Sequence, residues 1–415
     1  MARINGNYNK LPANYLFKTI AEKTSEFQAA NPEREVLKLG IGNTTEALTP
    51  TVLEGLHKGV NNLADRETYT GYGDEQGMSE MRAAVANLYA RYGVELDASE
   101  VFVSDGAKPD TANLQSIFSA DARVAVPDPV YPVYVDTNVI AGRAGTFHAE
   151  EGRYSNLMYM DCTKENGFVA DIDQLKKDAI YCGAVDMIYL CSPNNPTSAV
   201  MTHDQLKSYV DFANENDAAI IFDSAYASFI QDSSLPRSIY EVDGAKNCAI
   251  EVNSLSKSHG FTGVRLGWTI VPQALTVEDG EKLNPIWNRR QCTFFNGPSN
   301  VVQPGGLAAL TDEGMAESKK LVDFYMQNAG IIKDGMTNLG LNAMGGDNSP
   351  YIWIETPNGI PSWDFFGQLL NQAGVVGTPG AGFGTKGEGY LRLSGFNSRE
   401  NVIKAVKSIE DHLEL

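Results

Sequence analysis

The segment spanning residues 251–268 combines a lysine with hydroxyl and guanidinium groups. It reads EVNSLSKSHGFTGVRLGW and holds Lys257, Ser254, Ser256 and Arg265 among glycines. A lysine amine can form a Schiff base with an aldehyde, and serine hydroxyls with a guanidinium can bind a dianionic phosphate. These residue types predict Lys257 as the imine-forming residue and the other three as a phosphate site. A solvated turn with a surface lysine is the alternative for this segment alone.

The segment IIFDSAY places Asp223 at the carboxyl end of an apolar run and Tyr226 shortly after it. A carboxylate without a partner is costly at a buried strand end. Asp223 could keep the ring nitrogen of a pyridine-type cofactor protonated, which makes the ring an electron sink, and Tyr226 could hydrogen-bond the ring oxygen. A carboxylate that only caps the following turn is the alternative.

Three further loops carry candidate residues. CSPNNPTS holds Asn195, which could donate to the ring oxygen, although a turn rich in Asn and Pro needs no chemistry. SDGAKPD follows the run VFVS and should open a helix, so the amides of Ala107 and Lys108 can bind phosphate there. Tyr131 in DPVYPVY could stack on the pyridine face, although an aromatic residue between prolines also serves packing.

Near the end of the chain, GYLRLS carries Arg392 on a predicted strand. A guanidinium there could bind a substrate α-carboxylate through two hydrogen bonds, and a cross-strand pair is the alternative. Each candidate alone has an ordinary explanation. Their occurrence in one order, from phosphate loop through aromatic ring, Asn, Asp and Lys to Arg, favours one shared site for a cofactor with an aldehyde, a pyridine ring and a phosphate, such as pyridoxal phosphate (PLP).

Short apolar runs separated by helical patterns predict the frame that positions these groups. The runs are continuous, as expected for strands covered on both faces, and helical segments such as HDQLKSYVDFANEN lie between several of them. This pattern predicts an α/β sheet with crossover helices, which binds ligands at the carboxyl ends of its strands. The predicted strands are VFVS (101–104), RVAVP (123–127), DMIYLC (186–191), AIIFD (219–223), CAIEV (248–252) and GWTIVP (267–272).

After about residue 296 the pattern changes. One long helical stretch over 299–338 precedes YIWIE, a helix over SWDFFGQLLNQAG, a Gly-rich loop, YLRLS and a last helix. This order predicts a second, α+β domain that the N-terminal segment joins. We place the large PLP-binding domain at 50–295 and the small domain at 1–49 and 296–415.

Charge and cysteine usage exclude several classes of protein. The chain has 33 Lys and Arg against 52 Asp and Glu, a formal charge of -19 that repels nucleic acids and anionic membranes. No apolar run reaches the length of a membrane span, and no secretory-type run begins the sequence, so we expect a cytoplasmic protein. The cysteines are predicted to be buried, reduced thiols, and the histidines lack a metal-binding spacing.

The motifs NPT, D-x-A-Y, S-x-S-K, G-x-R-x-G-W and the late arginine resemble those of fold-type I, class I/II aminotransferases. More narrowly, the chain resembles the LL-diaminopimelate aminotransferase family over nearly its whole length. The resemblance implies a mainly parallel seven-stranded sheet with helices on both faces, a smaller α+β domain, PLP as cofactor and a homodimer with shared active sites. The segments that carry it are GIGNTTEALTP, GYGDEQG, DGAKPD, YPVYVDT, SLPRSIYE, FTGVRLGW, FFNGPSN and YLRLSGF.

The same resemblance assigns residue roles and a reaction. Lys257, Asp223 and Tyr226 match catalytic residues. The implied reaction converts tetrahydrodipicolinate and glutamate to LL-diaminopimelate and 2-oxoglutarate, in the biosynthesis of lysine and cell-wall precursors. The implied cofactor-binding residues are Tyr72 from the neighbouring subunit, Ala107, Lys108, Tyr131, Asn195, Asp223, Tyr226, Ser254, Ser256, Lys257 and Arg265. The implied substrate-binding residues are Tyr15, Gly42, Lys108, Tyr131, Asn195, Asn296, Arg392 and, from the partner chain and facing the distal amino acid group, Glu75.

The sequence departs from the family pattern at a few positions without replacing a cofactor residue. Three of these positions are expected near the distal pocket, so an aminotransferase of the same fold that acts on lysine or another amino acid is the alternative. A PLP-binding regulator without catalysis is disfavoured by the acidic charge and by the presence of Lys257. The departures are Asn43 for Asp, Ala47 for Pro, Asp74 for Pro, Pro109 for Cys and Ser198 for Gly.

Overall fold

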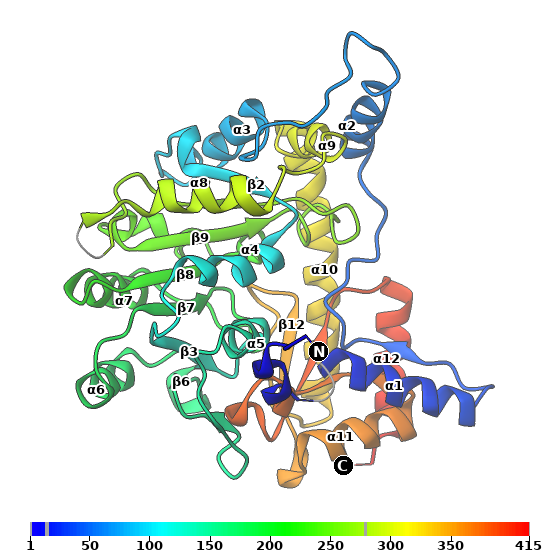
Figure 1. The fold of residues 1–415 in the computed structure, drawn as a ribbon. Coiled ribbons are helices and arrows are strands. Elements are labelled where there is room, and N and C mark those ends of the chain that lie inside the picture. Colours follow the sequence, from blue (N-terminus) through cyan, green and yellow to red (C-terminus); the bar gives the residue numbers. More distant parts are fainter. Residues whose placement is uncertain (1, 13–15, 278–279, 415) are drawn as a thin grey trace.

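The computed structural model describes residues 2–12, 16–277 and 280–414, and its largest element is a seven-stranded sheet (Figure 1). The strand order is β2-β10-β9-β8-β7-β3-β6, in which β10 runs antiparallel to both of its neighbours and the other paired strands are parallel. The mainly parallel sheet is thus confirmed. Its strands are β2 (Val101–Ser104), β3 (Val124–Asp128), β6 (Leu157–Asp161), β7 (Met187–Cys191), β8 (Ala219–Asp223), β9 (Ala249–Ser254) and β10 (Gly267–Ile270).

Both faces of this sheet are covered by helices. Along β7, Ile188 and Leu190 pack into one core with α3 and α7, while Met187 and Tyr189 pack into another core with α4, α5 and α8. Successive strand residues point to opposite faces, so burial on both sides explains why the strands read as continuous apolar runs. The helices are α2 (Pro50–Asn61), α3 (Ser79–Ala90), α4 (Ala107–Leu114), α5 (Val133–Ile140), α6 (Ile172–Cys182), α7 (His203–Glu215) and α8 (Leu283–Phe294).

A second, four-stranded sheet has the order β11-β12-β15-β14, and its core includes Trp353, Leu391 and Leu393. The N-terminal helix α1 and the C-terminal helices α11 and α12 lie around it (Figure 1). The strands are β11 (Ala343–Gly345), β12 (Tyr351–Glu355), β14 (Thr378–Pro379) and β15 (Tyr390–Ser394), beside the pair β1 (Leu37–Lys38) and β13 (Val375–Val376). The helices are α1 (Leu16–Ala30), α9 (Val302–Ala309), α10 (Asp312–Asn338), α11 (Ser362–Gln368) and α12 (Arg399–His412).

These elements are those expected for an α+β unit, and the bounds proposed for the two domains stay a prediction.

Strand β6 was not among the strands predicted from apolar runs. The stretch 299–338 is wrong as a single helix, because α9 ends at Ala309 and the side chain of Thr311 accepts a hydrogen bond from the amide of Gly314, which caps a new helix. Cys292 is exposed, contrary to the expectation of buried thiols, since it lies on the outer side of α8.

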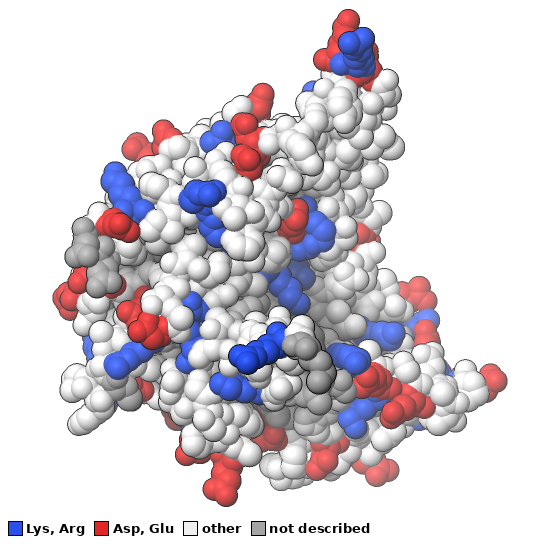
Figure 2. Space-filling view, in the orientation of Figure 1, with Lys and Arg blue, Asp and Glu red and all other residues white. Residues whose placement is uncertain are grey.

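The segment 62–78, between α2 and α3, projects from the body of the molecule (Figure 1). Its tip carries charged residues of both signs (Figure 2). A small two-stranded hairpin, β4 (Phe147–His148) with β5 (Arg153–Tyr154), extends from the other end of the large sheet. Within the described residues, no helix is both long and apolar enough to cross a membrane.

Candidate active site

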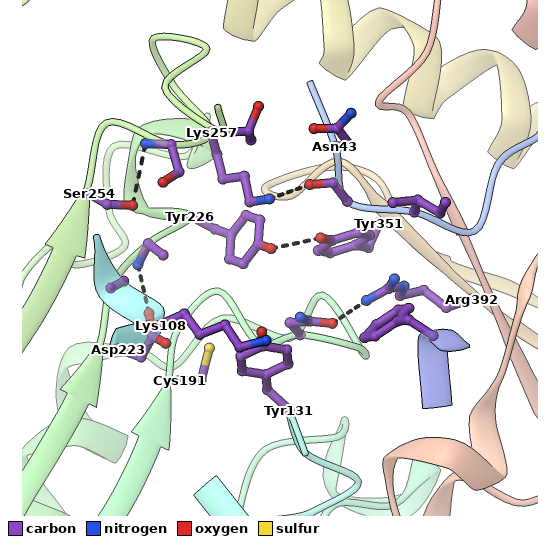
Figure 3. Close-up of a pocket in the computed structure, with 18 of the residues that line it drawn as sticks. Asn43, Lys108, Tyr131, Cys191, Asp223, Tyr226, Ser254, Lys257, Tyr351 and Arg392 are labelled. Carbon is purple, nitrogen blue, oxygen red and sulfur yellow. Dashed lines mark hydrogen bonds between the residues drawn. The ribbon is translucent and has the colours of Figure 1, made fainter. Parts of the chain in front are cut away.

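A cavity of about 450 Å³ lies at the carboxyl ends of β7, β8 and β9, where β15 and the segment 41–43 approach them (Figure 3). Lys and Arg atoms are visible in the hollow at the middle of the face drawn in Figure 2. The cavity therefore opens where the α/β pattern predicted a ligand site. The predicted residues that line it are Gly42, Ala107, Lys108, Tyr131, Asn195, Asp223, Tyr226, Ser254, Ser256, Lys257, Arg265 and Arg392.

Asp223 is the last residue of β8, and only 7% of it is exposed. Its Oδ2 accepts a hydrogen bond from Tyr134 Oη at 2.6 Å, and its Oδ1 accepts one from the amide of Ala225 at 3.0 Å. Burial raises the pKa of this carboxyl, although both hydrogen bonds and the charge of Lys257 oppose the shift. A cation within the cavity would therefore stabilise the ionised form of Asp223.

Lys257 follows β9 and extends into the cavity, where its Nζ donates to the carbonyl oxygen of Gly42 (Figure 3). Burial, together with the charges of Arg392 and Arg265, lowers the pKa of the Lys257 amine to about 8, and the carboxylate of Asp223 opposes this shift. An amine with a pKa near neutrality is neutral in a useful fraction of molecules, which both nucleophilic attack and proton transfer require. The position of Lys257 therefore suits the role that the sequence predicted.

Hydroxyl and guanidinium groups gather beside the start of α4. Arg265 Nη1 donates to Ser256 Oγ at 3.3 Å, and the amide of Ser256 donates to Ser254 Oγ at 3.4 Å. Arg265 has a φ of 71°, a left-handed conformation that a non-glycine residue holds only when its surroundings require it. Gly106 precedes α4 with a φ of 123°, and a Cβ there would collide with the Arg265 guanidinium. The backbone thus brings Arg265 against the helix N-terminus, as an anion site needs.

Arg392 lies on β15, and only 1% of it is exposed. Its Nη1 donates to Asn195 Oδ1, and its Nη2 donates to the carbonyl oxygen of Gly40 at 2.7 Å. Its Nε is buried and has no hydrogen-bond partner among the described residues. The guanidinium lies 4.3 Å from the ring centroid of Tyr351 and 4.9 Å from that of Phe383. These contacts fix the position of the Arg392 guanidinium, and its Nε remains able to donate to an additional acceptor such as a carboxylate.

Lys108 and Tyr131 lie on the wall of the cavity that faces Lys257 (Figure 3). Partial burial lowers the pKa of Lys108, which the carboxylate of Asp136 counteracts. The ring of Tyr131 packs edge-on against Tyr134, with 5.8 Å between the ring centroids. Tyr134 in turn donates to Asp223, so the same side chain positions both the ring of Tyr131 and the buried carboxylate.

Tyr72, Glu75 and Asn296 do not belong to the described lining of the cavity. Tyr72 is 89% exposed on the projecting segment, and Asn296 is exposed on the loop after α8. Glu75 and Asn296 belong to neighbouring loops, because a Cβ on Gly297 would lie 3.5 Å from the Cα of Glu75. Within one chain these residues are therefore outside the site. Tyr15 lies outside the described residues.

Sequence reasoning missed two tyrosines that organise the site. Tyr131 lies just before α5 and Tyr134 lies in its first turn, three residues later in the motif DPVYPVY, so the spacing could have placed both rings on one side. Tyr351 Oη shares a hydrogen bond of 2.7 Å with Tyr226 Oη. No local signal indicated Tyr351, because it is only the first residue of an apolar strand, and its partners are distant in the sequence.

Comparisons with known proteins agree with this geometry. Residues 34–409 match the family of class I and II aminotransferases. The chain belongs to that family, and it is an enzyme of the aminotransferase type.

The particular relatives agree with the narrower resemblance. The chain is 51% identical to an LL-diaminopimelate aminotransferase of Desulfotalea psychrophila, over 100% of both chains. It is 48% identical to an enzyme of the same name from Agathobacter rectalis, over 99% of this chain and 100% of that one. The solved structure of L,L-diaminopimelate aminotransferase from Chlamydomonas reinhardtii superposes with a TM-score of 0.92 at 44% identity, and covers 99% of this chain and 98% of that one. The resemblance predicted from the motifs and the fold-type I architecture are thus confirmed.

Proposed function

We propose that the protein is a PLP-dependent transaminase that converts tetrahydrodipicolinate and glutamate to LL-diaminopimelate and 2-oxoglutarate. The observation that carries the proposal is the convergence of Lys257, Asp223 and Arg392 on one cavity. The names of the relatives, at about half identity over the whole chain, support the choice of substrates.

The groups in the cavity fit pyridoxal phosphate. Asp223 is a buried carboxylate with a raised pKa, and a protonated pyridine nitrogen would supply the cation that stabilises it. Ser254, Ser256 and Arg265 would hold the phosphate together with the amides of Ala107 and Lys108 at the N-terminus of α4. Tyr226 and Asn195 would hydrogen-bond the ring oxygen, and Tyr131 would stack on the ring.

When bound, the cofactor supplies an electron-withdrawing ring that weakens the Cα–H bond of the amino acid joined to it. Arg392 binds and orients the α-carboxylate through its Nε and a further N–H. Lys257, with a pKa of about 8, takes the proton from the substrate Cα and returns a proton at the end of the transfer. Asp223, held by Tyr134, keeps the proton on the ring nitrogen. Ping-pong kinetics should follow, since one substrate leaves before the other binds.

We infer that two chains share their active sites. The projecting segment places Tyr72 in the open, where the phosphate group of a neighbouring subunit could be its partner. Glu75, with Asn296 beside it, would face the distal end of the substrate in that neighbour. Diaminopimelate has two identical amino acid ends, so an enzyme that uses only one must recognise the other, and an acidic group together with Lys108 offers both complementary charges.

A half-reaction tests the substrate. The PLP form is mixed separately with LL-diaminopimelate, meso-diaminopimelate, lysine, aspartate or glutamate, and the visible absorbance of the bound cofactor is followed. We expect rapid change with LL-diaminopimelate and glutamate alone. Change with lysine or aspartate, while LL-diaminopimelate stays inert, would keep the transaminase and refute the substrate. A protein that binds no PLP would refute both.

A further inference from the structure

Ser198 has a backbone conformation that favours glycine. It lies in the loop after β7 with a φ of 67°, and only 6% of it is exposed. The amide of Ser198 donates to the carbonyl oxygen of Asn194 at 2.9 Å. The amide of Asn194 donates to the carbonyl oxygen of Ala199 at 2.8 Å, so the loop is tightly closed. A serine is strained in this region, which means that the surrounding contacts must compensate for it.

The Ser198 hydroxyl bonds to the other sheet. Its Oγ donates to the carbonyl oxygen of Tyr351, the first residue of β12, at 2.6 Å. The space for the Ser198 side chain comes from Gly345 on β11, where a Cβ would lie 2.5 Å from the Ser198 Cβ. Gly345 itself has a φ of 80°. The two positions are thus complementary, because the side chain at 198 fits only beside a glycine at 345.

The same loop makes a second contact with that sheet. Asn195, three residues before Ser198, accepts a hydrogen bond from Arg392 Nη1. Tyr351 packs its ring against the Arg392 guanidinium and shares a hydrogen bond with Tyr226. The loop therefore joins the strand end of Tyr351 through Ser198 and the guanidinium of Arg392 through Asn195.

We propose that Ser198 is a positioning residue for carboxylate binding, a role that rests on the proposed transamination. Its hydroxyl fixes the distance between the loop that carries Asn195 and the strand that begins at Tyr351. This keeps the Tyr351 ring against Arg392, so that the guanidinium presents its remaining donors to the α-carboxylate. Ser198 itself touches neither the substrate nor the cofactor.

The variant Ser198→Ala removes the hydroxyl and tests this role. We expect the KM for glutamate and for 2-oxoglutarate to rise by about two- to tenfold, the effect of losing one buried hydrogen bond. The inhibition constant of glutarate, a dicarboxylate without an amino group, should rise by the same factor. The kcat should change by less than about twofold, because binding rather than the chemical step is affected. The PLP absorbance should be unchanged. Ser198→Gly, which suits the left-handed φ and removes the same hydroxyl, should fold and give the same rise.

Ser408→Ala is the matched control. The Ser408 Oγ donates to the carbonyl oxygen of Ala373 at 2.7 Å, a bond of the same kind that joins α12 to the segment after α11, away from the cavity. It should lower the melting temperature without changing KM. The proposal is overturned if Ser198→Ala and Ser198→Gly keep the wild-type KM and glutarate constant, or if Ser408→Ala shifts them equally. A wild-type enzyme that does not transaminate glutamate would refute the proposed function instead, and the glutarate measurement would still test Ser198.

Discussion

The replacement of Arg392 by lysine tests how the site binds carboxylates. Arginine presents donors on three nitrogens, of which Nη1 and Nη2 already bond to Asn195 and Gly40, while Nε has no partner among the residues described. A lysine ammonium has three donors on one nitrogen. If Asn195 and Gly40 keep two of them, only one remains for the substrate.

The expected loss follows from this count. Arg392 can give an α-carboxylate two charge-assisted hydrogen bonds, and lysine can give one, so the variant loses one such bond. A hydrogen bond to a charged group contributes about 1.5–3 kcal/mol, which corresponds to a fall in kcat/KM of roughly ten- to 150-fold. The lysine also loses the flat contact with Tyr351, where the guanidinium lies 4.3 Å from the ring centroid.

The assay is steady-state kcat/KM with glutamate and with 2-oxoglutarate. Arg399→Lys serves as the matched control, because Arg399 also lies over an aromatic ring, that of Phe324 at 5.1 Å, and also donates to an amide oxygen, that of Gln327 at 2.9 Å. The control should keep wild-type kinetics. If kcat/KM of Arg392→Lys falls by less than about threefold, the proposed bidentate binding of the carboxylate by Arg392 is wrong.

Three further predictions concern other groups. Lys257→Ala should lower kcat at least about a hundredfold while PLP remains bound after dialysis, and undiminished turnover would refute the role of Lys257. Glu75→Ala should reduce kcat/KM for LL-diaminopimelate about ten- to a hundredfold more than for glutamate, and equal losses would mean that Glu75 does not bind the distal end. Glu251, buried with hydroxyl donors, has a pKa raised to about 7 from 4.5, mainly by burial, so the folded protein keeps a proton that the unfolded chain releases. The free energy of unfolding should therefore fall by up to about 3 kcal/mol as the pH rises from about 4.5 to about 7. The variant Glu251→Gln should remove this pH dependence of the melting temperature, and an unchanged dependence would mean that Glu251 is not its source.

Most strands of the large sheet could be predicted from local sequence. Strands covered on both faces must be apolar throughout, and six of the seven were visible as continuous runs. The missed strand β6 (Leu157–Asp161) lies at the edge of the sheet, where Tyr159 and Asp161 are only partly buried, so its sequence, LMYMD, lacks the continuous burial of the other strands. The break between α9 and α10 was missed because only Leu310 and Thr311 separate the two helices, although Thr311 followed by two acidic residues is typical of a helix start.

The site was predictable where its residues follow strands. Asp223, Asn195 and Lys257 each come soon after an apolar run, and parallel strands bring such ends together. The contacts that organise them were not predictable in the same way. The hydrogen bond between Tyr226 and Tyr351 joins positions 125 residues apart, and no local pattern specifies such a pair.

The bonds of Arg392 join three distant parts of the chain, since Gly40, Asn195 and Arg392 belong to its beginning, middle and end. A nascent chain that has completed the seven-stranded sheet still lacks the carboxylate-binding group until the last strands are made. Transamination therefore reports complete folding of the chain, and a truncated product that binds PLP would retain the cofactor without turning over amino acids.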